Sequence, residues 1–343
     1  GIRKKYKKAD PILIEKTIYS FELLGNLAKL KSDFVFKGGT SLILLLPEIN
    51  RLSIDVDIIG KCAINLLDTV WNNTIFKRVE PLERKNRGIP KVHYKFYYDS
   101  VITNREDYVL LDIIVEKSVY PKTKLKQIET PFFETDERII INIPSINSII
   151  GDKLTAFAPE TIGIPYESKV YKKTMSIIKQ LFDISELFNY ITDISEVIES
   201  YKHVQEQESV FQGKSFTLEE TLSDTINTSF LISQLGFKGG IKDHKTEILE
   251  KGFHQLNSYL LNYRFTVLNA KLAASKAAVV ATIIKYNQDD VDFEQIRYTD
   301  SKLTEIRNIE ISNKYKILNK LKAISPESFY YWYFISKIKE HEK

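Results

Sequence analysis

The chain has 343 residues and a formal net charge of +4, so it is long enough for two domains, and its slight basic excess fits a polyanionic ligand without requiring one. Hydrophobic residues make up 43% of the chain and charged residues 27%, which excludes a disordered protein. The single cysteine, Cys62, excludes a disulfide framework, disfavours a zinc site built from cysteines and indicates a reducing, cytoplasmic setting.

The first half of the chain predicts helices and strands in alternation. A helix with Asp10 as its N-cap is expected over residues 11–30, because apolar residues recur there at helical spacing. A short strand over 34–36, a turn over 38–41 and a buried helix over 42–46 follow, and Pro47 ends that helix. Further strands are expected over residues 52–59, 92–98, 108–115 and 138–143. Such interleaving predicts a central sheet covered by helices on at least one face.

After Pro144 the pattern is helical. Ser145 can cap a helix that reaches residue 157, and the Gly/Pro loop over 159–165 is the expected domain boundary. Helices are expected over residues 170–191, 216–234, 245–261, 264–286, 302–322 and 326–340. The prediction is therefore an α+β domain over residues 1–165 and an all-helical domain over residues 166–343. The longest apolar run, residues 277–284, is too short to cross a bilayer, so no membrane span is expected.

The residues with the clearest chemical meaning lie between positions 37 and 57. Lys37-Gly38-Gly39-Thr40-Ser41 follows a predicted strand and opens a helix, so the backbone can approach a ligand closely and free N–H groups can bind a phosphate. Asp55 and Asp57 are two residues apart on a strand, so their carboxylates share one face, where Mg²⁺ would relieve their repulsion. The alternative is a solvated polar face of an edge strand; the glycines upstream favour a functional pair.

These segments resemble the DNA polymerase β nucleotidyltransferase superfamily and, more closely, the AbiEii-type nucleotidyltransferase toxins of bacterial toxin–antitoxin and phage-defence systems. The resemblance is carried by Phe-Lys-Gly-Gly-Thr-Ser-Leu at 36–42 and Arg-Leu-Ser-Ile-Asp-Val-Asp at 51–57. Two weaker segments follow in the family's order, Ile-Ile-Gly-Asp-Lys-Leu-Thr-Ala at 149–156 and Lys-Gln-Leu-Phe-Asp-Ile-Ser-Glu-Leu at 179–187. In the second of these, Lys179 and Glu186 replace the usual arginine and aspartate. The resemblance covers residues 20–190 and implies a polymerase β-like α+β fold.

The resemblance also implies a metal site of three carboxylates. Asp55, Asp57 and Asp112 would hold Mg²⁺, or Mn²⁺ in its place, and Asp112 would complete a second metal site and help to deprotonate the acceptor hydroxyl. Asp112 stands in an otherwise apolar strand, where an acid is costly to bury unless it is paired or metal-bound. The alternative places Asp112 at a strand end beside a basic residue such as Lys117.

Further residues would bind the NTP. Gly38, Gly39, Thr40, Ser41 and Ser53 are assigned to the triphosphate, and Lys37 and Arg51 either contact phosphates or are charges at the sheet edge. Lys153 would neutralise charge on the triphosphate, and Asp183 would orient Lys153 or the nucleotide. The alternatives are N-capping for Thr40 and Ser41, a polar strand position for Ser53, an exposed helix lysine for Lys153, and an ion pair with Lys179 for Asp183.

The implied function is Mg²⁺-dependent transfer of a nucleoside monophosphate from an NTP to an acceptor. By resemblance the acceptor is tRNA, the result is blocked translation, and the partner is a cognate antitoxin protein. Basic clusters at residues 1–8, 77–95 and 169–179 agree with RNA, although charge runs also occur on ordinary solvated surfaces. Two other classes stay open: a non-catalytic nucleotide- or RNA-binding module on the same fold, and a nucleotidyltransferase that acts on a protein or a small molecule.

Overall fold

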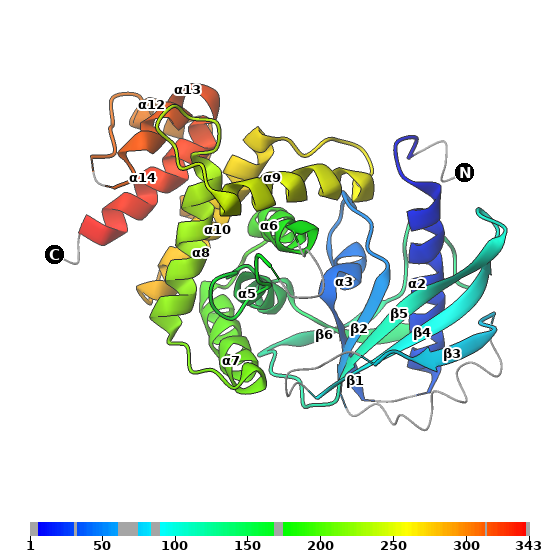
Figure 1. The fold of residues 1–343 in the computed structure, drawn as a ribbon. Helices are drawn as coiled ribbons and strands as arrows, with labels where there is room; N and C mark the ends of the chain where they lie inside the picture. The colour runs from blue at the N-terminus through cyan, green and yellow to red at the C-terminus, as the bar shows by residue number, and fades with distance from the viewer. Residues whose placement is uncertain are drawn as a thin grey trace. The chain divides into compact units, whose positions relative to one another are not determined.

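The computed structural model describes residues 6–30, 33–60, 75–83, 90–167, 174–312 and 314–340, with side chains up to residue 338 (Figure 1). The chain forms two compact units. The first comprises Gly1–Ser145 with Phe211–Gly213 and Ser258–Arg264, and the second comprises Ile146–Val210, Lys214–Asn257 and Phe265–Lys343. Residues 146–165, which were expected in the first domain, belong to the second unit, so the compact units do not coincide with the division expected at residue 165.

A mixed sheet of seven strands forms the first unit. Along the sheet the strands follow the order β3-β4-β5-β2-β1-β7-β6. β2 pairs with β5 and β1 pairs with β7 in parallel, and the other neighbours are antiparallel. The strands are β1 (Phe34–Lys37), β2 (Asp55–Gly60), β3 (Arg78–Pro81), β4 (Lys91–Ser100), β5 (Arg105–Ile114), β6 (Thr123–Gln127) and β7 (Ile140–Pro144).

Two helices of the first unit position its central strands. The helix α2 (Pro11–Lys29) packs against β2 and β5, and the Asp10 side chain caps it by accepting the N–H of Ile12, as expected (Figure 1). The helix α3 (Gly38–Leu45) begins directly after β1. The turn expected over residues 38–41 is therefore wrong: these residues form the first turn of the helix. Gly38 makes this possible, because its φ of +75° reverses the chain direction within one residue.

The two strands that the sequence did not predict, β3 and β6, are the two edges of the sheet. Their sequences, Arg-Val-Glu-Pro and Thr-Lys-Leu-Lys-Gln, are short and polar. Edge strands need no apolar residues on both faces and commonly carry charges that prevent pairing with another chain. Because these strands lack a hydrophobic pattern of period two, their sequences give no strand signal.

The second unit is helical, as predicted. Its helices are α5 (Ile146–Ala156), α6 (Thr174–Phe188), α7 (Ile194–Gln212), α8 (Leu218–Ser233), α9 (His244–Leu256), α10 (Val267–Lys285), α11 (Phe293–Ile296), α12 (Lys302–Ile306), α13 (Leu321–Ile324) and α14 (Pro326–Glu340), with 3₁₀ turns at Asn257–Tyr259 and Lys316–Lys320. The single helix expected over 302–322 is wrong, since α12, a 3₁₀ turn and α13 divide it. The acidic helix α7 was not predicted, although it buries Val197, Tyr201 and Val204.

The central helix of the second unit is α10, which packs against α6, α8 and α14. Its alanines, with Val279 and Val280, are fully buried, which allows the neighbouring helices to approach closely. By length and composition α10 could also cross a membrane, because an 18-residue window of this helix has a mean hydropathy of 1.5. However, 78% of this window is buried inside the structure. Together, the mixed sheet and the helical C-terminal part confirm the α+β fold class expected from the sequence.

Candidate functional site

A row of polar residues crosses four neighbouring strands of the first unit. Asp57 on β2 lies in register with Asp112 on β5 and with Lys37 on β1, and Asp112 lies in register with His93 on β4. Residues in register share one face of a sheet and lie about 5 Å apart. Asp55 is on the same face as Asp57, because side chains alternate along a strand. The sheet therefore brings the three predicted carboxylates onto one face.

Asp112 is the best-defined carboxylate of the row. His93 Nδ1 lies 2.6 Å from Asp112 Oδ1, and Lys91 Nζ lies 2.8 Å from Asp112 Oδ2. Burial alone would raise the pKa of Asp112, but the hydrogen bond from His93 and the charge of Lys91 outweigh it and lower the pKa to about 2. Asp112 lies within β5, and its partners Lys91 and His93 lie on the neighbouring strand β4. Its predicted role as a metal ligand stays a prediction.

Sequence reasoning missed both partners of Asp112. Lys91 and His93 are two residues apart on β4, so they share a face, but only the antiparallel register with β5 places them beside Asp112. Burial opposes the charged form of Lys91, yet the carboxylates of Asp112 and Asp57 outweigh it, and the pKa of Lys91 is raised. Lys91 is therefore a cation at neutral pH, held among carboxylates of the row.

The two glycines make room for side chains of the following motif. A Cβ on Gly38 would lie 2.9 Å from Cγ of Asp57. A Cβ on Gly39 would lie 2.5 Å from Nη2 of Arg51 and 2.9 Å from Oγ of Ser53. Real Cβ atoms do not approach other atoms so closely, so a side chain at either position would displace these groups. Gly38 also needs glycine for its φ of +75°. The structure thus brings the start of α3 against Asp57, Arg51 and Ser53. That these groups bind one ligand stays a prediction.

The hydroxyls of Thr40 and Ser41 bind the backbone within this site. Thr40 Oγ1 donates to the carbonyl of Asp55 at 2.5 Å, and Ser41 Oγ donates to the carbonyl of Gly38 at 2.8 Å. Both side chains are fully buried. Neither is the N-cap of α3, which is Lys37. Their assignment to the triphosphate stays a prediction, and the bonds that the structure records are structural: Thr40 joins α3 to β2.

The segment before β2 is held from two sides. On α2, Thr17 Oγ1 donates to the carbonyl of Ser53 at 3.0 Å and Ser20 Oγ donates to that of Ile54 at 2.6 Å. From the other side, the N–H of Leu52 donates to the carbonyl of Tyr259 at 2.8 Å, within the same unit. Sequence reasoning missed these residues because helix hydroxyls and a segment 200 residues downstream give no local signal. They fix the backbone that leads into Asp55.

Lys153 and Asp183 form an ion pair within the second unit. Lys153 on α5 and Asp183 on α6 approach to 2.9 Å between Nζ and Oδ2, and their side chains are only 6% and 1% exposed. Lys153 is thus a buried, paired lysine rather than the exposed helix lysine considered as its alternative. The predicted roles of both residues toward a nucleotide stay predictions.

The donor chemistry of the first unit fits a hard divalent cation at Asp55 and Asp57. Two carboxylates on one strand face, with phosphate and water oxygens completing the shell, are what Mg²⁺ prefers. In the part of the chain that the structure describes, no three acidic, histidine or cysteine side chains are arranged to hold a metal ion. Asp112 is turned toward Lys91 and His93 through both of its oxygens.

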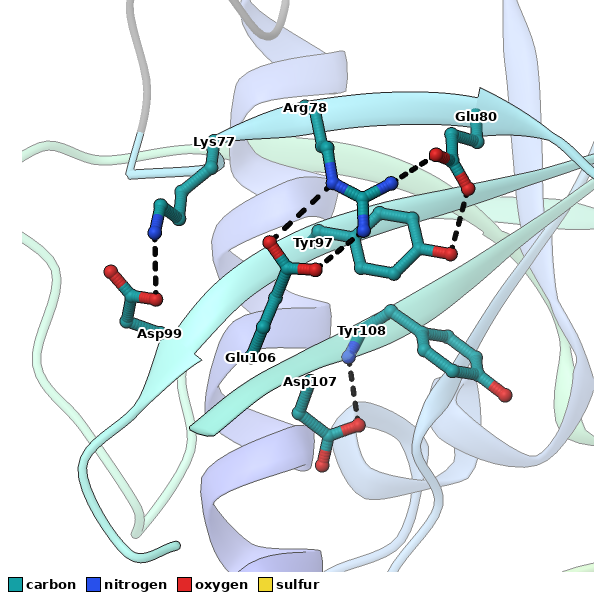
Figure 2. Close-up of polar contacts among 8 residues, drawn as sticks. All are labelled: Lys77, Arg78, Glu80, Tyr97, Asp99, Glu106, Asp107 and Tyr108. Carbon is teal, nitrogen blue, oxygen red and sulfur yellow. Dashed lines mark hydrogen bonds and ion pairs between the residues drawn. The ribbon is translucent and has the colours of Figure 1, made fainter. Parts of the chain in front are cut away.

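The outer strands on this unit carry a network of paired charges (Figure 2). Arg78 lies 3.5 Å above the ring of Tyr97 and bonds Glu106 and Glu80, and Lys77 pairs with Asp99 at 2.9 Å. These cations of the predicted basic cluster are therefore neutralised by neighbouring acids. Nine further basic residues of the predicted clusters lie outside the described residues: Arg3, Lys4, Lys5, Arg84, Lys85, Arg87, Lys169, Lys172 and Lys173.

The chain is similar to a protein family and to solved structures. The family model described as "Nucleotidyl transferase AbiEii toxin, Type IV TA system" matches residues 22–238, more than half of the chain. A "putative nucleotidyltransferase from H. pylori" shares 19% sequence identity at a TM-score of 0.45, covering 83% of this chain and 97% of its own. The Helicobacter pylori protein JHP933 shares 16% identity at a TM-score of 0.45, covering 88% and 100%. No curated protein matches.

Proposed function

Because the chain belongs to the AbiEii nucleotidyltransferase toxin family of type IV toxin–antitoxin systems, we propose that it transfers a nucleoside monophosphate from an NTP to an acceptor hydroxyl. The acceptor oxygen forms a bond to the α-phosphorus, the bond from that phosphorus to the bridging oxygen breaks, pyrophosphate leaves, and the hydroxyl proton passes to water. The observation that supports this most is the register of Asp57 with Asp112, with Asp55 on the same face and Gly38 packed against Asp57.

We assign the groups of the first unit as follows. Asp55 and Asp57 hold Mg²⁺, or Mn²⁺ in its place, which supplies charge neutralisation at the reacting phosphate. The N–H groups at the start of α3, the Ser53 hydroxyl and the Arg51 guanidinium bind phosphate oxygens. Asp112, whose pKa is lowered to about 2, is a carboxylate at neutral pH and adds its negative charge to that of Asp55 and Asp57.

The pair Lys153–Asp183 serves the same reaction in this proposal. A buried lysine with a single anchored geometry is a pre-organised cation, which stabilises charge on a triphosphate better than a mobile surface lysine. Its partner Asp183 keeps the ammonium group charged and in place. Lys153 then neutralises the developing charge of the pyrophosphate, and Asp183 positions it.

For the acceptor we propose tRNA, with blocked translation as the toxic effect and a cognate antitoxin protein as the neutralising partner in the cytoplasm. Support comes from membership in a toxin family. The paired cations around Arg78 do not favour RNA over other acceptors, so transfer to a protein or a small molecule is the second candidate. Salt separates the two: RNA binding should weaken steeply between 50 and 200 mM salt, by about tenfold or more, whereas a neutral small acceptor should barely respond.

The test uses purified protein, Mg²⁺ and each α-³²P-labelled NTP in turn, with total bacterial RNA or cell extract. The variant Asp55→Ala/Asp57→Ala should abolish labelling. Its matched control, Asp99→Ala/Glu106→Ala, removes two carboxylates from the outer strands of the same sheet and should leave labelling intact.

Label in RNA of tRNA size, absent from the Asp55/Asp57 variant, supports the proposal and identifies the preferred base. Label in protein keeps the reaction and replaces the acceptor. No label with any NTP, from a folded protein that binds nucleotide, contradicts the proposal and favours a non-catalytic binding module.

A further inference from the structure

A pair of tyrosines lies on the face of the sheet that carries the carboxylates (Figure 2). Tyr97 on β4 is in register with Tyr108 on β5, and their ring centroids are 5.6 Å apart. Tyr108 precedes Asp112 by four residues on one strand, so the two side chains share a face and lie about 13 Å apart along the strand. Both tyrosines are partly exposed. The sheet thus presents aromatic rings beside the proposed reaction centre.

The two rings are held in different ways. Arg78 lies 3.5 Å above the ring of Tyr97, and the Tyr97 hydroxyl donates to Glu80 Oε2 at 2.8 Å, so Tyr97 is fixed at both its ring and its hydroxyl. The Tyr108 hydroxyl has no hydrogen-bond partner among the residues that the structure describes. Tyr97 therefore supports the pair, and Tyr108 is the ring that can accept a ligand.

Lys95 lies between the tyrosine pair and the carboxylates. It is two residues from Tyr97 and two from His93 on β4, so all three share a face. Its Nζ lies 4.4 Å from the ring centroid of Tyr108, and within the described part of the chain Lys95 has no ion pair. A cation–π contact at a partly exposed site is weaker than the stacking of a base on an aromatic ring, so a base can displace Lys95 from the ring. The ammonium group can then bind a phosphate of the same strand.

The charges around the tyrosine pair favour stacking over a general attraction of phosphates. Cations and acids are equal in number there: Lys77, Arg78 and Lys95 against Glu80, Asp99 and Glu106. Because binding to an RNA duplex depends largely on its phosphates, a patch without net charge should hold a duplex weakly. Unpaired bases, in contrast, offer flat faces that stack on a tyrosine whatever their sequence. The patch therefore suits a single strand.

We propose that Tyr108 stacks an unpaired base of the RNA acceptor, that Lys95 binds the phosphate next to this base, and that Tyr97 positions the ring of Tyr108. The inference rests on the proposed function, which makes RNA the acceptor, and it deepens that function by naming the part of the RNA that is bound. Binding of a single strand can be measured without NTP, so the inference and the reaction can fail independently.

The experiment measures how tightly the full chain binds a fluorescently labelled single-stranded hexaribonucleotide of mixed sequence, by fluorescence anisotropy without NTP. The wild type should bind it more tightly than a blunt RNA duplex with as many phosphates. Tyr108→Leu should weaken binding about tenfold, because it removes the ring on which the base stacks. Tyr108→Phe should bind within about twofold of the wild type, because it keeps the ring and loses only the hydroxyl.

Lys95 is tested by salt dependence. Lys95→Met should lower the slope of log affinity against log salt concentration by about 0.7, the value of one phosphate contact to a single strand. The matched control is Tyr94→Leu, which removes a tyrosine from the opposite face of β4 and should bind like the wild type. Circular dichroism checks that each variant is folded, and if Tyr108→Leu is not, the salt slope of Lys95→Met decides.

Equal affinity for the single strand and the duplex, or a folded Tyr108→Leu that binds like the wild type, would overturn the inference, and so would an unchanged salt slope in Lys95→Met. In the labelling assay, Tyr108→Leu should raise the RNA concentration needed for half-maximal labelling about tenfold and leave that of the NTP unchanged. Labelled RNA without this rise would refute the inference and keep the proposed function. The expected binding without labelling of any acceptor would keep the RNA site and refute the function.

Discussion

Gly38 carries two constraints at once, a backbone φ of +75° and a carboxylate packed where its Cβ would be. Gly38→Ala should cost about 1–2 kcal/mol of unfolding free energy through the left-handed conformation. It should also weaken Mn²⁺ binding, because the methyl group displaces Asp57. Urea unfolding and Mn²⁺ titration measure the two effects.

The matched control is Gly236→Ala, at a φ of +73° with nothing within 4 Å of the added Cβ. It should show the same loss of stability with unchanged Mn²⁺ binding. Equal Mn²⁺ binding in both variants would mean that the contact with Asp57 does not shape the metal site.

Asp112 should make the stability of the first unit depend on pH. Its pKa is about 2 in the folded protein against 3.8 as the ordinary value, so the folded state binds the proton less well. The stabilisation is therefore complete above pH 3.8 and is lost as the pH falls toward 2. A shift of this size corresponds to about 2 kcal/mol.

Urea unfolding of the wild type and Asp112→Asn should differ by that amount at pH 7, and the difference should shrink as the pH is lowered from 4. A difference that does not change with pH would show that Asp112 is not the ionised partner of Lys91 and His93.

At the scale of elements, the pair Lys153–Asp183 joins α5 to α6. Lys153→Met should lower the unfolding free energy by about 3 kcal/mol, because it leaves Asp183 buried without a counter-charge. The double variant Lys153→Met/Asp183→Leu should recover most of that stability, since an apolar pair replaces the ion pair. NTP labelling should stay lost in both variants if the pair serves catalysis.

The control is Lys245→Met, which breaks an ion pair with Glu160 in the same unit at 42% and 47% exposure. Such exposed pairs contribute less than about 1 kcal/mol, so little stability should be lost. Recovery of labelling in the stable double variant would show that the buried pair has only a structural role.

At the scale of the whole molecule, the first unit is discontinuous in sequence. Ser258–Arg264 belongs to it, and its buried Leu260 and Leu261 lie beside residues 50–52, with Leu261 donating its N–H to the carbonyl of Asn50 at 3.0 Å. A fragment of residues 1–165 lacks this segment, which supports the backbone just before Asp55.

We expect the fragment to unfold at lower urea concentration than the full chain and to lose the hydrogen-exchange protection of the Leu52 amide, whose acceptor is the Tyr259 carbonyl. The amide of Leu111, within β5, is the internal control for a folded sheet. Unchanged protection of Leu52 in a folded fragment would show that residues 258–264 do not support the site.

Short-range patterns in the sequence by themselves determined several features of the fold and of the candidate site. Asp55 and Asp57 share a face because a strand has a period of two, and Gly38 must be glycine because the chain turns there with a φ of +75°. The cap at Asp10, the α+β first half and the helical second half also follow from short-range patterns. Each of these features depends on neighbours within a few residues.

Only the tertiary structure decided which groups meet. Lys91 and His93 reach Asp112 because β4 pairs with β5 in one register, and a shift by one residue would turn both side chains to the other face. The edge strands β3 and β6, the hydroxyls of Thr17 and Ser20, and the return of residues 258–264 likewise depend on contacts between distant segments. Register and long-range pairing are set by the packing of the whole sheet and its helices, so no single stretch of the sequence encodes them.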